Sequence, residues 1–104
     1  MGKVKMVYYL KEETIFEDGT RRSWSEAVYE SCAEAFKSVL EDINENNDKE
    51  DAVWSIDFGK SGHSTFVIRG DGKFLDYKSE FYETEPGERI YTIKEIAYRE
   101  AKKK

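Results

Sequence analysis

The stretch from Trp24 to Asn46 constrains the fold of this chain more than any other segment. At 100° per residue, its apolar side chains fall on one side of a helix and most of its acids fall on the opposite side. The apolar side holds Val28, Cys32, Ala35, Phe36, Val39 and Ile43. The acidic side holds Glu30, Glu34, Glu41 and Glu45, interrupted by Lys37. The pattern predicts one long amphipathic helix with one face in the core.

Local signals mark both ends of this predicted helix. Ser23-Trp24-Ser25-Glu26 has the spacing of a capping box, in which the Ser23 hydroxyl accepts from the Glu26 amide. The polar run from Asn44 to Asp48 contains residues that tolerate a left-handed exit from a helix. The sequence therefore predicts a helix that begins after Ser23 and ends near Asn46.

Alternation of polar and apolar residues predicts strands on both sides of the helix. The predicted strands are residues 3–10, with 14–16 and 20–22 forming a hairpin, and then 52–58, 64–69 and 73–81. Asp18-Gly19, Gly59 to Gly62 and Gly70-Asp71-Gly72 have the composition of the turns that join them. These short connections predict an antiparallel sheet.

The C-terminal part is predicted to end in a second helix. Residues 83–88 form an acidic loop with the only proline, and Arg89 to Tyr91 is extended. Thr92-Ile93-Lys94-Glu95 then has the spacing of another capping box, which opens a short helix. The predicted fold class is α+β, with an antiparallel sheet of four or five strands and the order β(β)-α-β-β-β-α. No linker or repeat divides the chain, so residues 1–104 are read as a single domain.

Charge is distributed unevenly along the chain. The net charge is −5, yet residues 26–51 hold nine acids and two bases, which leaves +2 for the remainder. A charge asymmetry of this kind concerns partners and association rather than fold.

The sequence shows no constellation of residues that predicts catalysis. The single cysteine, Cys32, lies in the apolar stripe, where it acts as a small hydrophobe, and the single histidine, His63, lies in a Gly/Ser-rich turn. Gly59-Lys60-Ser61 lacks the upstream glycine and the following helix of a phosphate-binding loop. We therefore expect no enzyme activity, no cofactor and no metal site.

From Trp24 onward the predicted element order is similar to that of double-stranded RNA-binding domains. Those domains bind phosphates with a basic cluster at the start of the last helix, and their first helix reads the minor groove. Here the last predicted helix opens with Lys94 as its one base, and the first presents glutamates that phosphates would repel. The resemblance carries over no binding residue.

A nucleotide- or RNA-binding module is nevertheless retained as the alternative function. Aromatic side chains on the sheet can stack a base while arginines contact phosphate. The candidates are Tyr77, Tyr82 and Tyr98 for stacking, and Arg69, Arg89 and Arg99 for phosphate.

The leading hypothesis is a non-enzymatic binding protein. A rigid row of carboxylates can occupy a basic groove meant for nucleic acid and so mimic it, although the same row also suits a solvated helix face. The size and charge are similar to those of phage-encoded anti-defence proteins and bacterial immunity proteins. We therefore expect a small acidic inhibitor or antidote that docks on a basic surface of a larger protein. Its predicted partner-binding residues are Glu26, Glu30, Glu34, Glu41, Asp42 and Glu45.

Two further expectations concern location and assembly. The sequence has no apolar run of the length that a signal peptide or a membrane span requires, and one cysteine fits a reducing compartment, so the cytoplasm is expected. Pairing of edge strands into a homodimer stays open.

Overall fold

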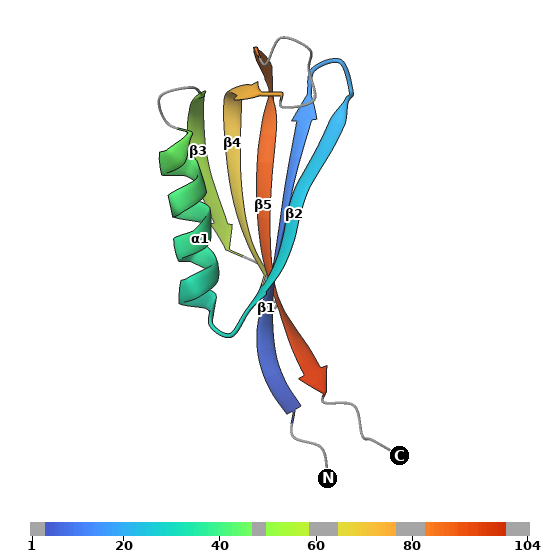
Figure 1. Ribbon diagram of the computed structural model, residues 1–104, viewed down its shortest axis with the longest axis vertical. Helices are drawn as coiled ribbons and strands as arrows, with labels where there is room; N and C mark the ends of the chain where they lie inside the picture. Colours follow the sequence, from blue (N-terminus) through green and yellow to red (C-terminus); the bar gives the residue numbers. More distant parts are fainter. Residues whose placement is uncertain (1–3, 47–49, 59–64, 77–82, 100–104) are drawn as a thin grey trace.

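Most of the described residues form one antiparallel sheet, and the one described helix packs on one of its faces. The computed structural model describes residues 4–46, 50–58, 65–76 and 83–99. Its elements are β1 (Val4–Phe16), β2 (Arg21–Tyr29), α1 (Cys32–Glu45), β3 (Asp51–Phe58), β4 (Thr65–Leu75) and β5 (Thr84–Arg99). The five described strands follow the order β2-β1-β5-β4-β3. Figure 1 shows the twisted sheet, with β1 and β5 continuing together beyond the start of α1.

The predicted fold class is wrong, because the described residues contain one helix and not two, and the strands are longer than predicted. Thr92–Arg99, where the short C-terminal helix was predicted, is the end of β5 and pairs with residues 4–11 of β1. β-Branched residues such as Ile93 and Ile96 suit a strand, and pairing with β1 gives their backbone groups partners. The element order of double-stranded RNA-binding domains is therefore not present here.

The helix is also shorter than predicted. Residues 21–29 form the edge strand β2, which pairs with β1, so the predicted capping box at Ser23 is wrong. The helix begins instead at Cys32, where the Ser31 hydroxyl caps it and accepts from the Glu34 amide at 3.2 Å. Its end at Glu45 and Asn46 confirms the predicted stop, although the φ of Asn46 is −99° and not left-handed.

The predicted turns have mixed outcomes. The N-terminal hairpin is confirmed, since Gly19 has a φ of 88° and the Phe16 amide donates to the Thr20 carbonyl at 2.9 Å. The predicted turn at Gly70-Asp71-Gly72 is wrong, because these residues lie inside β4. Most of the predicted acidic loop at 83–88 is strand, since β5 begins at Thr84. The turn at 59–62 and residues 77–81 lie outside the described part of the chain.

The core lies between α1 and the sheet. Leu10, Ala35, Val39, Ile68, Tyr91 and Ile93 form its buried cluster. Cys32, Phe36 and Ile43 pack against the cluster, which confirms most of the predicted apolar face of the helix. Val28 does not join them, because it is 59% exposed on β2. No described helix covers the opposite face of the sheet.

Candidate functional site

A buried ionic cluster lies where α1 packs on β1 and β5. Its centre is Arg89 of β5, which is 1% exposed. Arg89 donates to both carboxylate oxygens of Glu50, at 2.7 and 3.0 Å, and to the Thr14 hydroxyl at 3.1 Å. The centroid of the Phe74 ring lies 4.7 Å from the guanidinium carbon of Arg89. Bidentate pairing and a cation–π contact thus compensate the burial of the Arg89 charge.

Two more carboxyl groups crowd the same cluster. The Glu12 carboxylate lies 3.3 Å from the guanidinium of Arg89, but it also faces the negative charges of Asp42 and Glu50. Burial raises the pKa of Glu12 to about 7, and the two carboxylates add to this effect while Arg89 opposes it. The Tyr91 hydroxyl donates to Asp42, and burial raises the pKa of Tyr91 so that its phenol stays neutral.

The space beside Glu12 is too small for a substrate. It is a cavity of about 90 Å³, whereas sites for small organic ligands usually enclose some 300 Å³ or more. Leu10, Glu12, Ser38, Val39, Asp42 and Tyr91 line it. A carboxyl group that titrates near neutrality is suited to proton transfer, yet a substrate has no room to reach it. The contacts of the cluster link α1 to β5 through Asp42 and Tyr91, and they link the residue before β3 to β5 through Glu50 and Arg89.

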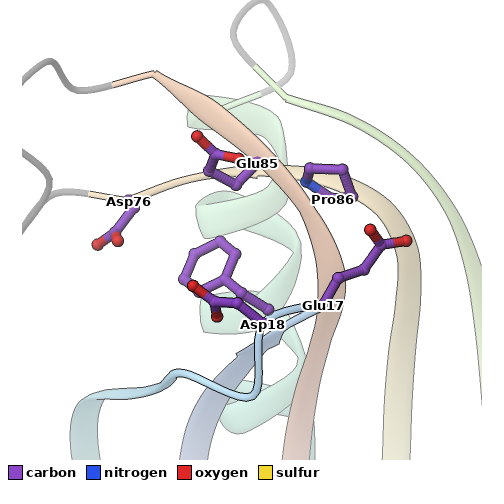
Figure 2. Close-up of a pocket in the computed structure, with 6 residues that line it drawn as sticks. Glu17, Asp18, Asp76, Glu85 and Pro86 are labelled. Atoms are coloured by element: carbon purple, nitrogen blue, oxygen red, sulfur yellow. The ribbon is translucent and has the colours of Figure 1, made fainter.

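Two hollows lie at the end of the molecule formed by the β1–β2 turn and the start of β5. One has a volume of about 390 Å³ and is drawn in Figure 2; the other, of about 600 Å³, shares Phe16, Glu17 and Pro86 with it. Among the residues that the structure describes, six carboxylates and no lysine or arginine line the two hollows. We call these residues the acidic end: Glu17, Asp18, Asp71, Asp76, Glu85 and Glu88.

Internal partners neutralise only part of the acidic end. Asp76 pairs with Arg22 at 3.2 Å, and Glu88 pairs with Arg69 at 2.6 Å. Asp18 accepts from the Thr20 amide at 2.8 Å, and hydrogen bonding to Thr20 lowers the pKa of Asp18. The remaining members, Glu17, Asp71 and Glu85, take part in none of the ion pairs found among the described residues.

The six predicted partner-binding residues do not form one row. Glu26 lies on β2, and Glu30 lies in the bend before α1, where it pairs with Lys5 at 3.1 Å. Asp42 points inward to Tyr91. The residues that do lie exposed on α1 are Glu34, Glu41 and Glu45.

The arginines predicted to contact phosphate in the alternative, RNA-binding function are less exposed to a ligand than predicted. Arg89 is buried against Glu50, and Arg69 is paired with Glu88. Tyr77, Tyr82 and His63 lie outside the described residues, as do the side chains of Tyr98 and Arg99. Cys32 is half-buried, and burial raises the pKa of its thiol, as expected of a packed rather than a reactive cysteine.

The acidic end was missed because its residues are scattered in the sequence. Local patterns place Asp18 only in a turn and Glu85 only in a loop, and they assign no role to Glu17. Their acidity was visible, but the pairing of β1 with β5 is what brings Phe16 opposite Gly87 and so joins the two segments.

Comparison with known proteins adds no assignment: no family model, curated protein or solved structure matches this chain. Within the described ranges, no helix is long and apolar enough to cross a membrane. The same ranges contain no group of three or more histidine, cysteine or acidic side chains placed to hold a metal ion.

Proposed function

We propose that this protein is a non-enzymatic binding protein that docks on a basic surface of a larger protein in the cytoplasm. The observation that carries the proposal is the acidic end, where six carboxylates line two adjoining hollows without a lysine or arginine among the described lining residues. An acidic inhibitor or antidote acts through such a surface.

The physical argument rests on Glu17, Asp71 and Glu85. These side chains are exposed, and none of them is neutralised by an ion pair within the described part of the chain. Unpaired carboxylates set close together attract lysine and arginine side chains, speed association and repel phosphates. The surface thus suits a basic protein better than RNA. The exposed glutamates of α1 are a second, weaker candidate, because Lys37 lies 4.0 Å from Glu41.

Two matched variants test which surface binds. The acidic-end variant combines Glu17→Lys, Asp71→Lys and Glu85→Lys, and the helix variant combines Glu34→Lys, Glu41→Lys and Glu45→Lys. Both change the net charge equally, so a difference between them reports location. The partner is first captured from a lysate of the native host at low salt, identified and purified, and its affinity for each variant is then measured.

We expect the acidic-end variant to weaken binding by roughly tenfold or more, with the wild-type affinity falling steeply as salt is added. Far-UV circular dichroism checks that both variants fold. Equal affinities for the wild type and the acidic-end variant would refute the proposed surface. Binding of RNA by the wild type in a direct assay, with no protein captured, would favour the alternative function.

A further inference from the structure

The two edges of the sheet differ in how they are protected. Edge strands expose unpaired backbone N–H and C=O groups, and proteins usually block them with charges, proline or bulges. β2 carries Arg21, Arg22 and Glu26, and its pairing with β1 is broken by an irregularity near Lys11 and Glu13. This edge has the usual protection.

The other edge, β3, has fewer of these devices than β2, although it carries the charged residues Asp51 and Asp57. It contains no lysine, arginine or proline, and it pairs with β4 without a register shift along its whole length. On its free side it has no strand partner among the described residues. Val53 and Ile56 are β-branched residues, a type that is enriched in strands. Their side chains are nevertheless 78% and 51% exposed. β3 is therefore the less protected of the two edges.

We propose that β3 pairs antiparallel with β3 of a second copy of this chain, about a two-fold axis at Ser55. This inference is independent of the proposed function. A two-fold axis perpendicular to the sheet keeps both helices on the same face and joins the two sheets into one. Residues opposite each other must then share a face, so odd positions pair with odd positions and even with even.

The side chains of β3 select this register. With the axis at Ser55, Trp54 lies opposite the partner's Ile56, and Val53 lies opposite the partner's Asp57. The Trp54 ring itself packs over Gly70 of β4, so this register is favoured because it places no like charges opposite each other within residues 51–58. An axis at Trp54 would instead place Asp51 opposite Asp57 twice, and like charges directly opposite are destabilising. An axis at Ile56 would shorten the paired segment.

The charge of the molecule favours a second copy in this orientation. Val53 of β3 lies opposite Asp71 of β4, which belongs to the acidic end, whereas Phe58 lies at the far end of the strand. Antiparallel pairing sets the start of β3 in one copy beside the end of β3 in the other. The two acidic ends are thereby kept apart, whereas parallel pairing would place them side by side.

Symmetric cross-linking tests the position of the axis. Opposite Cα atoms of an antiparallel pair lie about 4.5 to 5.5 Å apart, within the range of a disulfide. In a Cys32→Ser background, Ser55→Cys should form a covalent dimer when treated with oxidised glutathione. Val28→Cys, an exposed position on the β2 edge, is the control and should form much less. Equal cross-linking of the two variants would overturn the proposal.

Two lysine variants test the register by effects of opposite sign. Ser55→Lys places two lysines opposite each other and should raise the dimer dissociation constant roughly fivefold. Val53→Lys places a lysine opposite the partner's Asp57 and should lower the dimer dissociation constant or leave it unchanged. Sedimentation equilibrium measures both constants, and circular dichroism confirms folding. A wild-type protein that stays monomeric at several hundred micromolar, or equal weakening by both variants, would overturn the proposal.

Discussion

Neutralising Glu12 should remove a large part of the dependence of stability on pH. Glu12 is 8% exposed, and its pKa is raised from an ordinary value of 4.5 to about 7 in the folded protein, chiefly by burial. Below pH 4.5 the carboxyl group is protonated in both the folded and the unfolded state. Between pH 4.5 and about 7 only the folded state keeps the proton, so stability is lost as the pH rises through this window.

The size of the effect follows from the two pKa values. The difference between 4.5 and about 7, at about 1.4 kcal/mol per pH unit, corresponds to roughly 3 kcal/mol of unfolding free energy. Glu12→Gln keeps the shape of the side chain but cannot ionise. The unfolding free energy of the wild type minus that of Glu12→Gln should therefore fall by roughly 3 kcal/mol between pH 4.5 and pH 8.

Urea unfolding followed by circular dichroism at several pH values measures this difference. Taking the difference removes the titration of groups that both proteins share. Glu30→Gln, at an exposed glutamate outside the cluster, controls for the loss of one carboxylate from the net charge. Parallel stability profiles for the wild type and Glu12→Gln would refute the reasoning, because they would show that Glu12 ionises equally in both states.

Three further predictions concern the fold. Arg89→Met should destabilise the protein by about 3 to 5 kcal/mol in urea unfolding at pH 8, because it leaves the carboxylates of Glu50 and Glu12 buried without their cation. A loss of unfolding free energy below about 1 kcal/mol would contradict the described cluster. Gly70→Ala should lower the unfolding free energy by about 1 to 3 kcal/mol and alter the tryptophan fluorescence, because a Cβ at Gly70 would lie 2.7 Å from the Trp54 ring. An unchanged fluorescence spectrum would argue against this contact. Ser31→Ala should lower the unfolding free energy by about 1 kcal/mol because the helix loses its cap, whereas Ser23→Ala on β2 should lower it little. A larger loss for Ser23→Ala than for Ser31→Ala would support the longer predicted helix instead.

The candidate site shows what local patterns can and cannot predict. Acidity was visible in the sequence, and so was the exposure of Glu34, Glu41 and Glu45 on a helix. Asp42, however, points at Tyr91, and Arg89 was predicted to contact phosphate although it is buried against Glu50. These partners lie 49 and 39 residues apart in the chain, so no local pattern relates them.

The two errors that predict helix where the structure has strand have one common cause. Ser23-x-x-Glu26 and Ser31-x-x-Glu34 have the same capping-box spacing, and each is followed by residues that fit a helix. The first segment lies where β1 can pair with it, from Tyr8 opposite Tyr29 to Ile15 opposite Arg21, so it becomes strand. Thr92 to Arg99 becomes strand for the same reason, on the other side of β1.

The sequence by itself determined the features that depend on a few neighbouring residues. Alternation fixed strands at residues 4–10 and 52–58, glycine fixed the turn at Gly19, and the apolar spacing from Cys32 to Ile43 fixed the buried face of the helix. Only the tertiary structure decided the length of α1, the strand at the C-terminal end of the described chain, the buried cluster around Arg89 and the acidic end. Each of these depends on β1 lying between β2 and β5, and the free energy of that pairing comes from residues far apart in the chain.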